Sequence, residues 1–348
     1  MLKIIKILLL PLAYLYQSIV KIRNFLYNKN ILKINHLPVP VISIGNITAG
    51  GTGKTPFAIA LANILQKKGY NPAIITRGYK KNSKGQVLVS KGKDPLVSAR
   101  EAGDEPYLMA QKTRAVVIAN PNRYEAGNTA IQKYHCDLII ADDGFQHRKL
   151  ARDFDLVLWD PDHDPHKAQP LPSGYLREPL SAIKRASALV YTRTDQIPEN
   201  QANYLKKIKS DLPHYFAQLK ISCLYRANDK TKISSKAIEG KSLVAFCGLG
   251  NPEQFFATVQ NFQPKKLKTR GFSDHHKYSQ QELKKLIKEF KEYDFLITTE
   301  KDLSNFPKNA QIPENILILA VELEVPNSIV DQILKAINYS DFISNPSK

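Results

Sequence analysis

Short apolar runs alternate with segments of helical periodicity along most of the chain. Runs of strand length occur at 38–45, 71–76, 115–119, 138–141, 156–159 and 188–191. Between the first two, apolar residues recur at helical spacing over 56–70 and end near Gly69, which is a plausible helix terminator. This alternation predicts an α/β fold with a doubly wound parallel sheet. In that architecture, functional residues gather beyond the carboxyl ends of the strands.

A second α/β pattern follows a polar, lysine-rich segment at 226–241, which we interpret as a hinge. A strand is expected at 242–248, a helix from Glu253 and another buried strand at 293–299. A chain of 348 residues is long enough for two hydrophobic cores. We therefore expect an N-terminal segment (1–30), a larger α/β domain (31–225) and a smaller C-terminal α/β domain (226–348).

The first thirty residues are apolar, rich in tyrosine and basic. Their longest uncharged stretch covers fourteen residues, 7–20, whereas a membrane-spanning helix needs roughly 20. An amphipathic helix lying in the membrane interface fits best, with apolar side chains at the acyl boundary and cations at anionic headgroups. A helix packed on the domain's own core and an export signal are the alternatives, although no small-residue cleavage site follows.

The strand-like run 38–45 leads into a glycine-rich turn that ends in Gly53-Lys54-Thr55. Successive backbone N–H groups in such a turn form a concave anion site. Lys54 can reach terminal phosphates, and the Thr55 hydroxyl can ligate Mg²⁺. The usual first glycine of this loop is replaced by Thr48. A chance Gly-Lys-Thr in a β–α turn is the alternative.

Two acidic pairs are further candidates. Asp142 and Asp143 follow the strand at 138–141, where carboxylates can hold Mg²⁺ beside a nucleotide, although a surface turn is also possible. Asp104 and Glu105 precede an apolar helix. Asp104 could cap that helix or act as a base that accepts the proton of an attacking hydroxyl, and the residues alone leave both interpretations open.

The charge and the cysteine content exclude fewer functions than these motifs do. The 50 Lys and Arg residues exceed the 32 Asp and Glu residues and give a net charge of +18. Such a field attracts polyanions, although a lysine-rich proteome would also produce it. No segment combines aromatic and basic residues as nucleic-acid recognition requires, so we expect no nucleic-acid partner. The three cysteines form no close pair, which argues against a disulfide framework or a zinc site.

Two classes of nucleotide-binding protein are disfavoured, because the sequence lacks a residue or a spacing that is diagnostic of each. A GTPase needs Asp-x-x-Gly, whereas Asp142-Asp143-Gly144 has a different spacing. A membrane-associated partitioning ATPase needs a lysine at the position of Ala49. Phosphoryl transfer to a small acceptor remains, with a membrane-recruited NTPase switch as the alternative.

The chain resembles the tetraacyldisaccharide 4′-kinase (lipid A 4′-kinase) family. The matching segments, in the family's order, are SIGNITAGGTGKTP, TRGY, GDEP, NRYEAG, ADDGFQH, SGYLREP, FCGLGNPEQFF, FSDHHKY and TTEKD. The family's loop generally lacks the first glycine, which accounts for Thr48. The resemblance implies a two-lobed P-loop fold and transfer of the ATP γ-phosphate to the 4′-hydroxyl of a tetraacylated glucosamine disaccharide 1-phosphate. It also implies a peripheral or monotopic protein on the cytoplasmic face of the bacterial inner membrane, and we expect a monomer.

The resemblance also assigns roles to particular residues. For nucleotide binding it implies Thr48, Ala49, Gly50, Gly51, Thr52, Gly53, Lys54 and Thr55, together with Arg123, Gln146 and Glu178. For catalysis it implies Asp104 as the base with His275 of the second lobe as its partner, assisted by Lys54, Asp143 and Arg177. For Mg²⁺ it implies Thr55, Asp142 and Asp143, without deciding which oxygen is the direct ligand.

Overall fold

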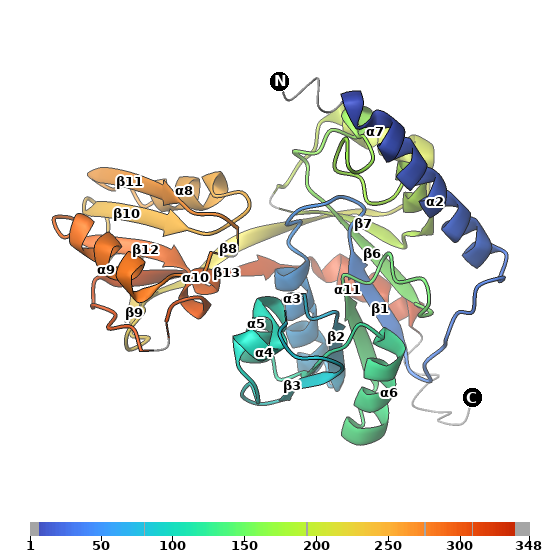
Figure 1. The fold of residues 1–348 in the computed structure, drawn as a ribbon, viewed down its shortest axis with the longest axis horizontal. Coiled ribbons are helices and arrows are strands. Elements are labelled where there is room, and N and C mark those ends of the chain that lie inside the picture. The colour runs from blue at the N-terminus through green and yellow to red at the C-terminus, as the bar shows by residue number, and fades with distance from the viewer. Residues whose placement is uncertain (1–6, 80, 193, 275, 308, 338–348) are drawn as a thin grey trace. The chain divides into compact units, whose positions relative to one another are not determined.

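The computed structural model describes residues 7–337 except 80, 193, 275 and 308. The chain divides into two compact units: unit 1 contains Met1–Gln218 and Leu323–Lys348, and unit 2 contains Leu219–Glu322. Two strands carry the chain from one unit to the other, namely β8 (His214–Arg226) and β13 (Ile316–Glu324) (Figure 1). Each unit is a sheet with helices packed against it.

Unit 1 is built on a mostly parallel sheet. Its strand order is β8-β7-β6-β1-β5-β2-β4-β3, and only β3 is antiparallel to its neighbour. The strands with bounds not yet given are β1 (Val41–Gly45), β2 (Pro72–Thr76), β3 (Val87–Lys91), β4 (Val116–Ala119), β5 (Leu138–Asp142), β6 (Phe154–Trp159) and β7 (Ala188–Thr192). The central strands are buried throughout because helices or loops cover both faces, which explains their continuous apolar runs.

Alternate residues of each strand point to opposite faces of the sheet, and both sets are mostly apolar in the central strands. Helices therefore cover both faces of the sheet in unit 1. They are α2 (Leu10–Asn28), α3 (Lys54–Lys67), α4 (Ala99–Ala102), α5 (Asp104–Lys112), α6 (Arg123–Tyr134), α7 (Glu199–Ile208) and α11 (Asn327–Ala336), with 3₁₀ turns η1 (Pro165–Lys167) and η2 (Leu180–Arg185). Phe57 of α3, Met109 of α5 and Ile329 of α11 share one core with Ile42 of β1. Ala126 of α6 packs in a separate core that contains Val41.

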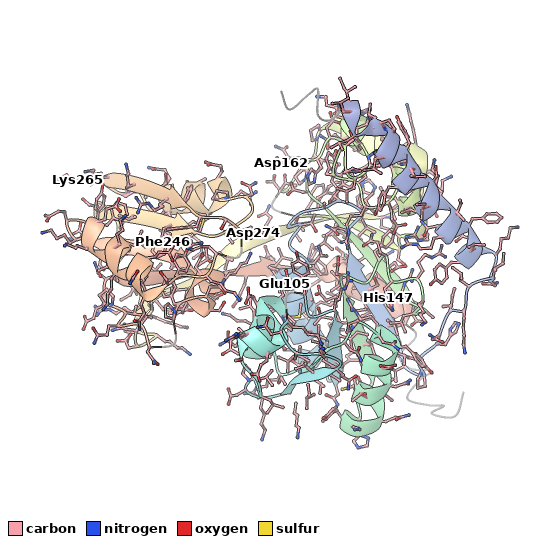
Figure 2. All side chains as sticks on the ribbon, in the orientation of Figure 1. Glu105, His147, Asp162, Phe246, Lys265 and Asp274 are labelled. Atoms are coloured by element: carbon pink, nitrogen blue, oxygen red, sulfur yellow. The ribbon has the colours of Figure 1, made fainter. Side chains whose placement is uncertain are left out.

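Unit 2 is a smaller α/β layer structure with strand order β11-β10-β12-β13-β8, to which β9 (Lys232–Ile233) adds. Strands β10 (Ser242–Cys247), β11 (Lys266–Gly271) and β12 (Phe295–Thr299) are parallel. Its helices are α8 (Glu253–Gln260), α9 (Gln280–Glu289) and α10 (Glu300–Ser304), with the 3₁₀ turn η3 (Ser235–Ala237). Phe246 of β10 lies in the core that also contains Leu283 and Leu286 of α9, and Figure 2 labels it.

The domain boundaries differ from those expected. The chain leaves unit 1 within β8, not in a hinge at 226–241, and that segment lies wholly in unit 2. The C-terminal part of the expected domain 226–348 returns to unit 1, where Val330 and Ile333 of α11 are buried in the core. A strand continues through each crossing, so the composition does not change there.

Helix α2 presents two different faces. Ala13 and Val20 are buried, whereas Leu12, Leu15, Ile19 and Ile22 follow one another at helical spacing and are 53–60% exposed. No helix among the described residues is long and apolar enough to cross a bilayer. Figure 1 shows α2 in blue on the outside of unit 1.

Candidate functional site

The loop between β1 and α3 has the shape that phosphate binding requires. Gly50 and Gly53 take φ values of 116° and 81°, a region that favours glycine. The Asn46 Nδ2 donates to Thr52 Oγ1 at 3.0 Å, and the Thr192 hydroxyl donates to the Thr52 carbonyl oxygen at 3.0 Å. These two bonds hold the loop to the carboxyl ends of β1 and β7, which flank β6 in the sheet. Pro56 lies in the first turn of α3, as its missing N–H allows.

Several loop amides remain available to an anion. The N–H groups of Gly53, Lys54 and Thr55 have no acceptor within the described part of the chain. They stand at the N-terminus of α3, where the helix dipole also favours negative charge. The Ala49 N–H, in contrast, donates to the Tyr175 carbonyl oxygen at 2.6 Å. That bond uses a donor that the sequence analysis assigned to the nucleotide.

Asp143 joins the loop to the end of β5. Its carboxylate accepts two hydrogen bonds from Arg177, at 2.8 and 3.1 Å, and Lys54 Nζ lies 3.6 Å from Oδ1. Burial alone would raise the pKa of Asp143, but the Arg177 hydrogen bonds and the nearby cations lower it to about 2. Asp143 is therefore a carboxylate at any physiological pH.

Asp142 has the opposite environment. Its side chain is buried, Oδ2 accepts from the Thr76 hydroxyl at 3.0 Å, and Oδ1 has no partner among the described residues. Burial raises the pKa of Asp142 to about 7, and the negative charges of Glu105 and Asp143 add to the shift. An unsatisfied, buried carboxylate oxygen is costly unless a cation or donor reaches it. The donor set therefore fits a hard cation such as Mg²⁺.

Arg123 and Gln146 bond to backbone carbonyl oxygens next to the carboxylate pair and the phosphate loop. Arg123 is buried and is the first residue of α6. Its guanidinium donates to the Asn120 and Asp142 carbonyl oxygens at 3.0 and 3.1 Å. Gln146 donates to the Asn46 carbonyl oxygen at 2.7 Å, and its Oε1 is buried without a partner in the described residues. Burial and the nearby cations lower the pKa of His147, labelled in Figure 2, to about 4.

Asp104 is the first residue of α5 and not its cap. The N-cap is Gly103, at φ 93°, where a Cβ would lie 2.7 Å from the Tyr79 carbonyl oxygen. The neighbouring Glu105, labelled in Figure 2, raises the pKa of Asp142 through its charge, which places the start of α5 near the end of β5. His275 lies outside the described residues.

Glu178 bonds to groups other than the predicted nucleotide ligands. Its side chain is fully buried, and its carboxylate accepts from Arg185 at 3.0 and 3.1 Å and from Asn24 Nδ2 at 2.7 Å. These partners come from η2 and α2, and no described residue of the phosphate loop bonds to it. Glu178 therefore holds α2 in this structure.

The site contains residues that the sequence analysis did not single out. Asn46 bonds to the phosphate loop, to Gln146 and, through Oδ1, to Arg177 at 3.1 Å. Thr76 bonds to Asp142. Both residues stand at carboxyl ends of predicted strands, and that position was the available signal.

In unit 2, three of the segments that carry the family resemblance meet at Asp302. This residue is 1% exposed, and its carboxylate accepts from the Gly248 N–H at 2.7 Å, the Tyr278 hydroxyl at 2.9 Å and the Thr299 hydroxyl at 2.6 Å. Asp302 thus ties the ends of β10 and β12 to the segment after β11.

We expect Asp302→Ala to lower the free energy of unfolding of unit 2 by about 3 kcal/mol or more, because three donors, two of them buried, lose their acceptor. Urea unfolding followed by far-UV circular dichroism would measure this loss of stability. Asp294→Ala removes one exposed acceptor, for the Ser242 N–H, and should cost at most about 1 kcal/mol. Equal losses in the two variants would contradict the role given to Asp302.

Comparison with known proteins identifies the family. Residues 5–338 match the family model described as tetraacyldisaccharide-1-P 4′-kinase. The chain belongs to this family. Tetraacyldisaccharide 4′-kinases of Desulfotalea psychrophila and Aquifex aeolicus are 39% and 40% identical to it; the first alignment covers 84% of this chain and 86% of the relative, and the second 85% and 88%.

A solved structure agrees with this assignment. The crystal structure of LpxK from Aquifex aeolicus, in complex with ATP, matches with a TM-score of 0.75 and 34% sequence identity, over 96% of this chain and 99% of that chain. The predicted α/β fold class is thereby confirmed. As a tetraacyldisaccharide 4′-kinase, the protein is an ATP-dependent kinase of lipid A biosynthesis that acts on a lipid disaccharide phosphate.

Proposed function

We propose that the protein transfers the γ-phosphate of ATP to the 4′-hydroxyl of tetraacyldisaccharide 1-phosphate at the N-terminus of α3. One observation supports this most strongly: open amides at Gly53, Lys54 and Thr55 lie beside a cation–carboxylate cluster of Lys54, Asp143 and Arg177. The amides and Lys54 would bind phosphate oxygens, and fixed donors of this kind stabilise charge that spreads over the transferred group.

Mg²⁺ fits the carboxylate pair. Asp142, through its unsatisfied Oδ1, Asp143 and the Thr55 hydroxyl would hold the ion. No group of three or more His, Cys, Asp or Glu side chains suited to a metal occurs among the described residues, which agrees with a metal that takes its remaining ligands from phosphates and water. When bound, Mg²⁺ neutralises charge on the phosphate oxygens.

Asp104 is proposed as the base. It would accept the proton of the acceptor hydroxyl, and a carboxylate can serve as this base because the proton moves late in a loose transition state. The role of His275, as the group that orients Asp104, rests on the family resemblance.

The direct test is incubation with γ-labelled ATP and tetraacyldisaccharide 1-phosphate, followed by chromatography of the lipid. Label should appear in a bisphosphorylated lipid, and ATP consumption should require the acceptor. Hydrolysis of ATP at the same rate without acceptor, and no labelled lipid, would favour the NTPase switch instead.

Binding of Mg²⁺ should release protons. Because the pKa of Asp142 is raised to about 7, about half of this carboxyl is protonated at pH 7, and a bound cation favours the ionised form. Calorimetry with a non-hydrolysable ATP analogue, in buffers of different ionisation enthalpy, should detect about half a proton at pH 7 and almost none at pH 9. An Asp142→Asn variant that releases the same number of protons would contradict this assignment.

We also propose that the exposed apolar face of α2 docks on the anionic surface of the inner membrane. Leu15, Ile19 and Ile22 would enter the acyl boundary, and the basic side chains of Lys21 and Lys29 would meet headgroups.

The triple substitution of Leu15, Ile19 and Ile22 by serine should weaken binding to anionic vesicles by about 100-fold, because three apolar side chains lose their transfer energy. Vesicle sedimentation would measure the effect. Leu96→Ser removes an equally exposed apolar side chain outside α2 and should leave binding unchanged. Wild-type binding by the triple variant would refute the docking face.

A further inference from the structure

The protein-facing side of α2 bonds to the segment that supplies Arg177. The Tyr16 hydroxyl donates to the Arg177 carbonyl oxygen at 2.9 Å, and Asn24 Nδ2 donates to the Glu178 carboxylate at 2.7 Å. Tyr16 and Asn24 are about 12 Å apart along the helix. Two consecutive residues of the segment are therefore fixed by two separate turns of α2.

The contact at Glu178 is a buried ionic cluster. Arg185 neutralises the carboxylate, Arg23 of α2 lies 3.9 Å from it, and the Arg185 guanidinium stands over the Phe145 ring at 4.5 Å. Phe145 follows Asp143 by two residues. A buried carboxylate with several donors has one favourable position, since loss of any donor leaves charge uncompensated.

A second connection returns from α2 to the segment after β5. Arg148 donates to the Asn24 carbonyl oxygen at 2.9 Å and lies over the Tyr27 ring at 5.2 Å. Asn24 thus contacts two segments next to the site. Its side chain bonds to the segment that contains Arg177, and its backbone bonds to the segment that follows the carboxylate pair.

Arg177 itself connects these contacts to the phosphate loop. Its backbone N–H donates to the Ile47 carbonyl oxygen at 2.8 Å, while its carbonyl accepts from Tyr16. Its guanidinium then reaches Asp143 and Asn46. The backbone of Arg177 is therefore held on one side by the phosphate loop and on the other by α2.

We propose that α2 is a positioning element for the phosphoryl-transfer site, in which Tyr16 and Asn24 act as positioning residues for Arg177 and, through it, for Asp143. This inference rests on the proposed function. The helix then has two separable roles, because its stripe at Leu12, Leu15, Ile19 and Ile22 is exposed, whereas Tyr16 and Asn24 bond to the segment that supplies Arg177. One face binds the membrane and the other holds the catalytic ion pair.

The test separates the two faces. Tyr16→Phe, Asn24→Ala and the double variant are compared with Ser18→Ala, whose exposed hydroxyl donates to the Tyr14 carbonyl oxygen of its own helix. Steady-state kinetics on detergent-dispersed acceptor give kcat and both KM values, and vesicle sedimentation gives membrane affinity. The double variant should have kcat lowered about tenfold, with unchanged vesicle binding, because two positioning hydrogen bonds are lost. Asn24→Gln, which keeps the donor, should recover part of kcat.

The opposite pattern is expected from the exposed face, where the triple serine variant should lose vesicle binding and keep kcat in detergent. Wild-type kcat in the double variant would overturn the inference, as would a fall in kcat that follows vesicle binding through all variants. If Asn24→Ala fails to fold, the nearly isosteric Tyr16→Phe still tests the inference, because it removes only the hydroxyl that bonds to the Arg177 carbonyl oxygen. An inactive wild-type protein would instead overturn the proposed function on which the inference rests.

Discussion

Asp104→Asn is expected to lower kcat by about 10²–10⁴-fold while ATP affinity stays close to that of the wild type. Asparagine keeps the size and the hydrogen-bonding shape of the side chain but cannot accept the proton of the acceptor hydroxyl. The helix should not suffer, because the N-cap of α5 is Gly103. Steady-state kinetics and calorimetric ATP binding measure the two quantities separately.

The matched control is Glu101→Gln. Glu101 lies on the preceding helix α4 and accepts from the Ser98 N–H at 2.9 Å in a capping box, which glutamine can preserve. This variant should turn over like the wild type. Near-normal turnover by Asp104→Asn would mean that Asp104 has only a structural role in the first turn of α5.

Lys54→Met should lower kcat/KM by about 10²–10³-fold, because one preorganised charge on the transferred phosphate is lost. Methionine keeps much of the aliphatic stem. Arg177 remains on Asp143 through two hydrogen bonds, so the carboxylate stays ionised and the effect reports on the phosphate contact. Kinetics at saturating acceptor, with ATP varied, measure the change.

Lys67→Met controls for the loss of a lysine from the same helix. Lys67 is exposed in the last turn of α3, far along the chain from the phosphate loop, and its substitution should leave kinetics unchanged. If Lys54→Met behaves like Lys67→Met, the loop has been misinterpreted.

The hydrophobic pattern predicted most of the fold because burial on both faces makes each central strand a continuous apolar run. The runs at 38–45, 138–141, 156–159 and 188–191 correspond to β1, β5, β6 and β7. The same reasoning placed Asp142 and Asp143 at the end of a strand beside the phosphate loop, since β5 pairs with β1. Local pattern and topology suffice for such features.

Features that depend on long-range contacts could not be predicted. Glu178 accepts a hydrogen bond from Asn24, which is 154 positions away, so no spacing in the sequence reveals that it contacts α2. The bond from the Ala49 N–H to the Tyr175 carbonyl oxygen could not be predicted for the same reason, because the two residues are far apart in the sequence. The unit boundaries were misplaced because β8 and β13 continue through them as ordinary strands. The roles of Asp104 and His275 and the expected monomer stay predictions.

The return of the chain to unit 1 affects synthesis on the ribosome. Ile329, Val330 and Ile333 of α11 complete a core whose other members lie before residue 218 or in the same C-terminal segment, 323–337. Unit 2, which is continuous in sequence, can close as soon as it emerges, whereas the larger unit stays unfinished until α11 has left the exit tunnel. During that interval the core residues that pack against α11 would lack their apolar partners, and this is the period in which we expect a chaperone to be needed.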